Sequence, residues 1–222
     1  RYSPGIKTVF HAVETNKDGH YTVTGQIEQD DGRMAGWILR VDDKGTIIWQ
    51  RPYPRGSFAS INKSSTMPDG SIVLVGQVNP VGGGPDSAWV MKVDSLGTAL
   101  WQRYFSGHYK YTAPDMIGYE DGRLAVLLNA QPLEDADRGH IRILTLSPRG
   151  YLMNVENFTD GRHAYGAVLT RGSYEERVVG GHLLNHIFNE EGEEEIEGAY
   201  NTNGWVLAMT ALDPYQDPCV RP

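Results

Sequence analysis

Residues 37–51, WILRVDDKGTIIWQR, recur at residues 89–103 as WVMKVDSLGTALWQR. Upstream of each copy, an Asp-Gly pair precedes an apolar run that ends in Gly-Gln, KDGHYTVTGQI at 17–27 and PDGSIVLVGQV at 68–78. The offset is 51 residues in the upstream block and 52 in the downstream block. Two separate blocks that share one period indicate an internal repeat.

Two further copies are degenerate but remain in phase. The third copy has its Asp-Gly block at residues 120–128 and its second block at 143–150. The fourth copy has the corresponding blocks at 171–182 and 205–213, and an acidic insertion at 189–203 separates them. Four copies of the module therefore cover nearly the whole chain.

Each copy predicts four short strands. The first strand ends at the Asp-Gly pair, the strongest short hairpin signal. The second is the run that ends in Gly-Gln, the third starts at the Trp, and a Gly-containing turn leads to the fourth. Alternation such as Tyr21/Val23 fits half-buried strands, and no segment has a helical period. Four-stranded units at a fixed period are typical of propeller blades, whereas the competing β-sandwich does not require equal repeats.

We therefore predict an all-β fold, a β-propeller of four four-stranded antiparallel blades. The blades are expected near residues 8–56, 57–107, 108–161 and 162–213, with a Pro-rich tail at 214–222.

The two ends of the repeat predict how the ring closes. The last copy has no fourth strand, and the first residues, RYSPG at 1–5, resemble RYFSG at 103–107, the end of a fourth strand. Residues 1–7 are expected to complete the last blade, which would remove two open sheet edges. The alternative is that the chain is a slice of a larger propeller.

Composition excludes several classes of function. The 222 residues carry a formal net charge of −8, and Lys and Arg occur singly, so a nucleic-acid partner is not expected. No apolar run approaches the ~20 residues that cross a bilayer, so we expect no membrane insertion by this segment. The single cysteine, Cys219, permits no internal disulfide.

The repeat resembles a known group of bacterial propellers. The pattern Asp-Gly, strand, Gly, then Trp-strand-Asp-x-x-Gly-x-x-x-Trp resembles the seven-bladed-propeller-type repeats of secreted and cell-envelope proteins. The segments VDDKGTIIW at 41–49 and VDSLGTALW at 93–101 are also similar to the docking motif of pyrroloquinoline-quinone-like propellers. The resemblance implies that the Trp packs between blades and that the protein is periplasmic, extracellular or envelope-associated. The chain lacks the adjacent Cys pair of many quinoproteins, so we expect no cofactor.

Candidate metal sites are weak. His182 and His186 are four apart, but in a strand this spacing separates them by ~13 Å, too far for one ion without a bend. The acidic run at residues 190–197 lacks the EF-hand pattern, so a solvated loop is the preferred interpretation over a Ca²⁺ site. We expect no metal. Within this run, Glu193, Glu194 and Glu195 are candidate contacts for a basic partner surface.

No residue stands out as catalytic. Asp18, Asp69 and Asp121 recur at one position of the module, as a structural turn residue would. No nucleophile elbow, phosphate loop or His-Glu-x-x-His motif is present.

Tyrosines outside the repeat register are candidate binding residues, because tyrosine combines a large contact area with a polar tip. They are Tyr109, Tyr111, Tyr119, Tyr165 and Tyr200. We therefore expect a non-catalytic binding or scaffold module that contacts a protein partner within a larger exported protein. The alternative is a carbohydrate-active enzyme or a lectin-like carbohydrate-binding propeller.

Overall fold

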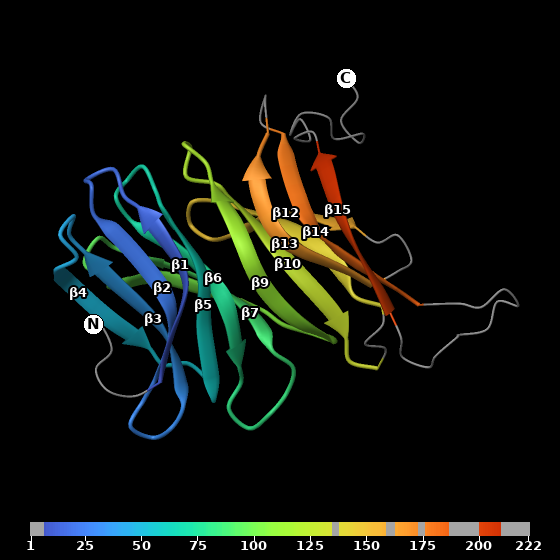
Figure 1. Ribbon diagram of the computed structural model, residues 1–222, viewed down its shortest axis with the longest axis horizontal. Helices are drawn as coiled ribbons and strands as arrows, with labels where there is room; N and C mark the ends of the chain where they lie inside the picture. Colours follow the sequence, from blue (N-terminus) through green and yellow to red (C-terminus); the bar gives the residue numbers. More distant parts are fainter. Residues whose placement is uncertain (1–6, 135–137, 159–162, 173–175, 187–199, 210–222) are drawn as a thin grey trace, which may run out of the picture.

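The protein is described from a computed structural model, which describes residues 7–134, 138–158, 163–172, 176–186 and 200–209. These residues form fifteen strands and no helix, so the prediction of an all-β chain is confirmed for this part of the molecule. The strands follow one another as antiparallel meanders, which we call units 1 to 4 (Figure 1).

Units 1 to 3 have four strands each. Unit 1 comprises β1 (Thr8–Thr15), β2 (Tyr21–Glu28), β3 (Met34–Val41) and β4 (Ile47–Tyr53). Unit 2 comprises β5 (Phe58–Thr66), β6 (Ile72–Asn79), β7 (Ser87–Val93) and β8 (Ala99–Phe105). Unit 3 comprises β9 (Tyr109–Gly118), β10 (Leu124–Pro132), β11 (His140–Leu146) and β12 (Leu152–Phe158).

Unit 4 has three described strands, β13 (His163–Arg171), β14 (Arg177–His186) and β15 (Tyr200–Met209). Residues 1–6 and 210–222 lie outside the described residues, so the closure of the last blade by the N-terminus stays a prediction. The number of blades stays a prediction as well.

The units lie side by side in chain order, from the blue end of Figure 1 to the red end. Consecutive units meet through their first strands, because β1 contacts β5, β5 contacts β9, and β9 contacts β13. A single parallel bridge between Met34 and Phe58 also joins β3 to β5. The chain is therefore a row of sheets stacked face to face rather than one continuous sheet.

A hydrophobic cluster fills each junction. Between units 1 and 2 it includes Ile38, Ile61, Leu74, Trp89 and Met91. Between units 2 and 3 it includes Val75, Val90, Met116, Val126 and Leu144. Between units 3 and 4 it includes Leu127, Ile141, Ile143, Leu169 and Val179. Because the middle strands of each unit are packed on both faces, their sequences are nearly continuous runs of apolar residues.

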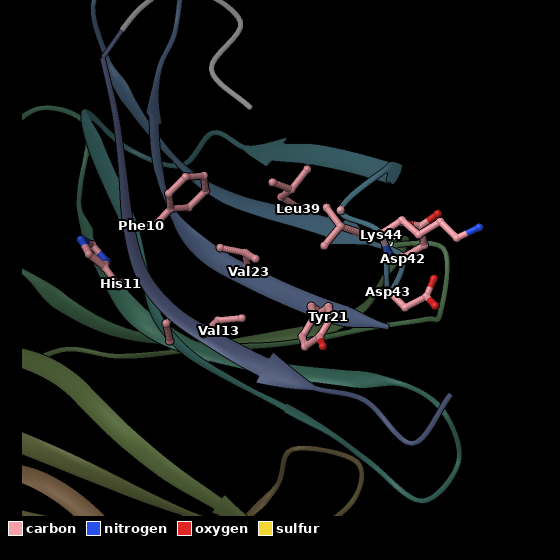
Figure 2. A pocket seen from close by; sticks show the side chains of 12 residues that line it. Phe10, His11, Val13, Tyr21, Val23, Leu39, Asp42, Asp43 and Lys44 are labelled. Carbon is pink, nitrogen blue, oxygen red and sulfur yellow. Dashed lines mark hydrogen bonds between the residues drawn. The ribbon is translucent and has the colours of Figure 1, made fainter. Parts of the chain in front are cut away.

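The face of unit 1 that points away from unit 2 is hollowed into a groove of about 690 Å³. Phe10 of β1, Val23 of β2 and Leu39 of β3 project into the same space, and the turn at residues 42–45 closes one end (Figure 2). Leu39 is next to Ile38, which faces unit 2, so the two sides of β3 serve the two faces of the sheet.

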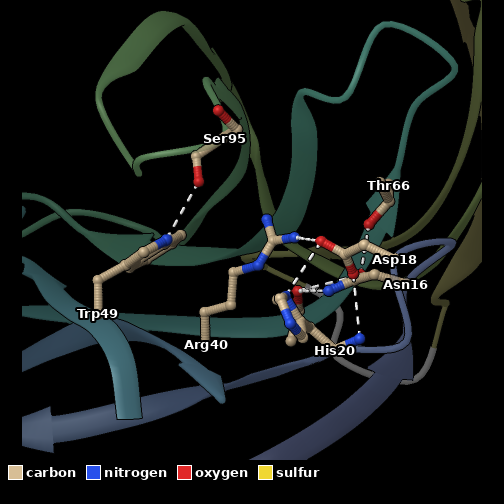
Figure 3. Close-up of polar contacts among 8 residues, drawn as sticks. Asn16, Asp18, His20, Arg40, Trp49, Thr66 and Ser95 are labelled. Atoms are coloured by element: carbon tan, nitrogen blue, oxygen red, sulfur yellow. Dashed lines mark hydrogen bonds and ion pairs between the residues drawn. The ribbon is translucent and has the colours of Figure 1, made fainter. Parts of the chain in front are cut away.

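A tryptophan on the fourth strand joins unit 1 to unit 2, and another joins unit 2 to unit 3. The indole N–H of Trp49 donates to the carbonyl oxygen of Ser95 at 3.1 Å (Figure 3), and the indole of Trp101 donates to the carbonyl oxygen of Pro148 at 3.3 Å. Both acceptors lie in the turn between the third and fourth strands of the following unit. The repeated tryptophan is therefore a residue of the junctions.

The recurring aspartates have structural roles. Asp18 of the first turn pairs with Arg40 on β3 (Figure 3), and at the equivalent place Asp69 pairs with Lys92 Nζ at 2.9 Å. Asp121 in unit 3 pairs instead with Arg123, two residues along the same turn. In units 1 and 2 these contacts tie the turn of the first hairpin to the third strand.

Each first strand carries one extra residue near its middle. In unit 2 this residue is Asn62, and Gly76 lies opposite. A Cβ on Gly76 would lie 1.9 Å from the carbonyl oxygen of Ser60, so only glycine permits this close approach. The corresponding register shifts lie at Phe10/Ala12 on β1, at Thr112/Asp115 on β9 and at Gly166/Val168 on β13.

The extra residue reaches the neighbouring unit. The side-chain amide of Asn62 donates to the carbonyl oxygen of Ala113 at 3.0 Å, and His11 Nδ1 lies 3.1 Å from the carbonyl oxygen of Ile61. Because a bulge bends its strand, it also turns these side chains toward the next first strand.

Candidate functional site

An aromatic and basic cluster lies at one end of unit 3, where unit 3 meets unit 2. It consists of Tyr109 and Tyr111 on β9 and of His140 and Arg142 on β11. In each pair the two residues are two positions apart, so both side chains of the pair point to the same face of the sheet. We call these four residues the tyrosine–arginine cluster.

The cluster is held together by ring contacts and hydrogen bonds. The ring centroids of Tyr109 and His140 are 5.0 Å apart with perpendicular planes. The guanidinium of Arg142 lies 5.0 Å from the ring centroid of Tyr109 and 5.5 Å from that of Tyr111. Arg142 Nη1 also donates to the hydroxyl of Tyr111 at 2.7 Å, and Arg142 Nε donates to His140 Nε2 at 3.0 Å.

A small residue on the middle strand makes this contact possible. Ala130 of β10 is the register partner of Tyr111 on one side and of His140 on the other. Its single methyl group leaves the space above the sheet to the larger side chains. The rings can therefore meet across β10, two strands apart in the sheet.

The environment of the cluster sets its protonation. Burial, followed by the positive charge of Arg142, lowers the pKa of His140 below its usual range. A neutral imidazole fits the geometry, because His140 Nε2 must carry no proton to accept the hydrogen bond from Arg142. Burial likewise raises the pKa of Tyr111. At neutral pH the cluster therefore offers the guanidinium cation of Arg142, a neutral imidazole and the neutral phenol of Tyr111.

Unit 2 completes one side of the cluster. The backbone N–H of Tyr111 donates to the carbonyl oxygen of Asp86 at 2.8 Å, and Lys110 Nζ lies 3.2 Å from the Asp86 carboxylate. Asn79 also donates to this carboxylate at 3.0 Å. The start of β9 is thus fixed against unit 2, which keeps the two tyrosine rings in place.

The predicted tyrosines do not form one surface. Tyr109 and Tyr111 come together, whereas Tyr119 lies at the other end of β9, where Arg171 stacks over its ring at 4.6 Å. Tyr165 stands on β13 between His163 and His182, at centroid distances of 4.4 and 5.0 Å.

The other predicted contacts are less well placed. Tyr200 begins β15 and is the register partner of His186. Glu193, Glu194 and Glu195 lie outside the described residues. Their role stays a prediction.

Sequence reasoning missed His140 and Arg142. The alternation His-x-Arg at the start of β11, two strands from Tyr-x-Tyr at the start of β9, was the available signal. This signal can be interpreted only when the register of β9, β10 and β11 is known, because Ala130 lies opposite both Tyr111 and His140.

Two carboxylates of the first strands are used in unit junctions. Glu14 accepts the backbone N–H of Thr66 at 2.8 Å, and Asp115 accepts the backbone N–H of Leu169 at 2.9 Å. Both bonds cross from one unit to the next. In the described parts of the chain, no three metal-ligating side chains gather at one place. Nor does that part contain a helix long and apolar enough to cross a membrane.

Comparison with known proteins gives matches at the level of structure alone. No protein-family profile and no curated protein matches the sequence. The α-L-arabinanase of Penicillium chrysogenum, solved with arabinobiose, superposes with a TM-score of 0.61 at 11% identity, over 91% of this chain and 62% of that chain. The α-L-arabinofuranosidase Arb93A of Fusarium graminearum, solved with an iminosugar inhibitor, superposes with a TM-score of 0.61 at 10% identity, over 94% of this chain and 65% of that chain.

These matches correct one expectation. The expected non-catalytic scaffold with a protein partner is wrong as the leading interpretation, because the neighbours are carbohydrate-active enzymes and favour the carbohydrate alternative. The sequence pointed the other way because repeated Asp and Trp residues are structural, and a repeat of structural residues says nothing of what the propeller binds.

At the level of fold, the comparisons agree with the repeat. The chain spans less than two thirds of the length of each of these enzymes. The finer resemblance to bacterial seven-bladed and quinone-type repeats stays a prediction. The fold of this chain is that of a β-propeller.

Proposed function

We propose that this protein is a carbohydrate-active propeller, an enzyme that acts on arabinose-containing glycans. The observation that carries the proposal is the superposition of nine tenths of the chain on two propeller enzymes, one of them solved with arabinobiose. The net charge of −8 and the neutral phenol of Tyr111 fit an uncharged ligand better than a phosphate-bearing one.

We place sugar recognition at the tyrosine–arginine cluster. The half-buried ring of Tyr109 offers an apolar face to the C–H groups of a sugar ring, and its tilted neighbour Tyr111 lies 5.8 Å away. Arg142 has five N–H donors, of which the contacts above use two, so donors remain for sugar hydroxyls. A few fixed polar groups beside an aromatic surface are typical of small-molecule sites.

The reaction is a separate part of the proposal. Glycoside hydrolysis requires two carboxyl groups that flank the scissile bond. Glu14 and Asp115 accept backbone hydrogen bonds from the neighbouring unit, so we assign them to the junctions rather than to catalysis. We assign no catalytic residue, and we propose that residues 1–213 belong to one exported propeller domain.

The proposal is tested by titrating arabinobiose and longer arabino-oligosaccharides into the chain by calorimetry. We expect Tyr109→Ala and Arg142→Met each to weaken binding about tenfold or more, since each removes a main contact. Tyr119→Ala is the matched control, because this tyrosine lies at the other end of β9, and its affinity should equal that of the wild type. Equal affinity in all four proteins, or no binding of any glycan, contradicts recognition at this cluster.

Hydrolysis is measured in parallel by release of reducing sugar. If the chain binds the oligosaccharide but releases none, recognition stands and the enzymatic part of the proposal is wrong.

A further inference from the structure

The junctions between units follow one plan, which can be read twice in the molecule. At the junction of units 1 and 2 and at that of units 2 and 3, the fourth-strand tryptophan of one unit donates to the turn before the fourth strand of the next. A second contact reaches the glycine of the same turn: the hydroxyl of Tyr53 donates to the carbonyl oxygen of Gly97 at 2.6 Å, and Arg103 Nε donates to that of Gly150 at 3.0 Å.

Unit 1 has the receiving half of this plan. Its turn at residues 42–45 is the equivalent of the turn at 94–97, which Trp49 contacts. This turn lines the 690 Å³ groove together with the apolar residues of β1, β2 and β3 (Figure 2). The groove thus lies where the tryptophan strand of a preceding unit would fit.

The apolar face of the groove corresponds residue by residue to the covered face of unit 2. The repeat aligns Tyr21 and Val23 of unit 1 with Ile72 and Leu74 of unit 2. Ile72 is fully buried under unit 1, whereas Tyr21 is 36% exposed. Phe10 and Val13 on β1 are also exposed, at 45% and 67%. At these positions the surface is therefore covered in unit 2 and open in unit 1, whereas Trp37 and Leu39, on the same face of β3, are buried.

The charges of the groove match the repeat as well. Arg51, two residues after Trp49, is close enough to Asp94 for its positive charge to help lower the pKa of that carboxyl, after the hydrogen bond from Thr98. The equivalent turn of unit 1 presents two carboxylates, Asp42 and Asp43. An arginine at the same strand position of an incoming unit would face both.

In the part of the chain that the structure describes, the strands of unit 4 do not cover this face. Units 1 and 4 lie at opposite ends of the row (Figure 1), and no strand of unit 4 packs against a strand of unit 1 among the described residues. Unit 4 has an open face of its own, since Val206 is 75% exposed while its equivalent in unit 2, Val90, is fully buried. The row of units therefore has an open apolar face at each end. The face of unit 1 is the side that would receive a preceding unit, and the face of unit 4 is the side that would receive a following one.

We propose that the open face of unit 1 docks a further four-stranded unit of the same repeat, whose fourth-strand tryptophan binds the turn at residues 42–45. The further unit belongs to the same propeller, which accordingly has more than four blades. This is the larger-propeller alternative of the sequence analysis, and it is independent of the sugar site.

The test supplies the missing unit from the chain itself. A duplicate of residues 6–56, inserted between residues 5 and 6 and followed by residues 6–222, places a second copy of unit 1 before the original in the 51-residue register. We expect the Tm to rise by about 5 °C or more, because stacked repeats gain stability from nearest-neighbour interfaces. Hydrogen exchange in the β1 strand of the original unit should slow at least tenfold.

The matched control is the same insertion with Trp49→Ala in the inserted copy alone, which should lose most of both gains. Unchanged exchange in β1 and an unchanged Tm on insertion would overturn the proposal.

Two measurements on chains without the insertion test whether something else occupies the open face of unit 1, either a second copy of the chain or unit 4. Light scattering reports whether the wild-type chain dimerises through this face, and a dimer that protects β1 from exchange would make a second copy the occupant. In a Cys219→Ser background, Val13→Cys with Val206→Cys would form a disulfide if unit 4 closed the ring on unit 1. Either result overturns the proposal, whereas a monomer without cross-link supports it.

Discussion

One carboxylate oxygen of Asp115 accepts the backbone N–H of Leu169 at 2.9 Å, across the junction between units 3 and 4. The other oxygen accepts the backbone N–H of Met116 at 2.8 Å and lies 3.6 Å from Nζ of Lys63 in unit 2. A single buried carboxylate therefore connects three consecutive units.

Asp115→Ala should lower the free energy of unfolding by about 1–3 kcal/mol, because it leaves buried N–H groups without an acceptor. Urea unfolding measures the loss. Lys63→Met is the control, and it should cost about 1 kcal/mol or less, since the lysine is half exposed. Equal losses in the two variants would mean that the ion pair, rather than the backbone hydrogen bonds, matters at this junction.

The Asp69–Lys92 pair should make stability depend on pH in acid. Burial alone would raise the pKa of Asp69, but hydrogen bonds from Ser71 and Lys92 outweigh it and hold the pKa at about 2. The stabilisation is present above the ordinary carboxyl pKa of about 3.9 and is lost as the pH falls toward 2. The stability difference between wild type and Asp69→Asn should therefore shrink between pH 4 and pH 2.

Since Asp69 is largely exposed, we expect a small effect, about 1 kcal/mol or less. Chemical unfolding at several pH values measures it. A difference that stays constant down to pH 2 would contradict a depressed pKa.

Arg142→Met should raise the pKa of His140 toward its usual value. Burial is the first cause of the lowered pKa and stays in the variant, so the shift should be partial. NMR titration of the His140 ring measures both proteins. In wild type, stability should fall as the pH drops below 6.5, because the unfolded chain binds a proton that the folded chain resists. If the pKa of His140 were the same in wild type and in Arg142→Met, the guanidinium would have no part in lowering that pKa.

Gly150→Ala should destabilise the protein more than Gly70→Ala. Both glycines have a left-handed φ, +76° and +78°, so alanine costs each about 1–2 kcal/mol in backbone strain. A Cβ on Gly150 would also lie 2.9 Å from the ring of Trp101, whereas nothing lies within 4 Å at Gly70. Thermal unfolding of the two variants gives the difference, and equal losses would show that the Trp101 junction has room to adjust.

The sequence predicted the repeating part of the fold well. The strands of units 1 to 3 follow from Asp-Gly pairs, from the alternation of apolar and polar residues and from the Trp positions. These are local signals that recur along the chain. The resemblance to known propeller repeats implied that Trp49 and Trp101 pack between blades, and the structure adds their carbonyl acceptors.

The candidate site could not be predicted in the same way. Tyr109 and Tyr111 were singled out because they break the repeat, but Arg142 and His140 reach them only through the register of three strands. A carbohydrate ligand was predicted only as the alternative, because the repeat reports the scaffold and does not report what the scaffold binds. Whether Tyr119 or Tyr165 shares a surface with Tyr109 depends on which end of a strand each occupies, and the spacing along the chain does not encode this.

The extra residue in every first strand has a consequence for how such proteins diversify. A bulge increases the local bend and twist of its strand, and here the bend lies where one sheet meets the next. The angle between neighbouring sheets, and with it the circumference of a ring, thus depends on one residue per module. Deleting Asn62 and its counterparts would remove one residue from each module and leave the core of each sheet as it is. The size of the ring would change through this one repeated position.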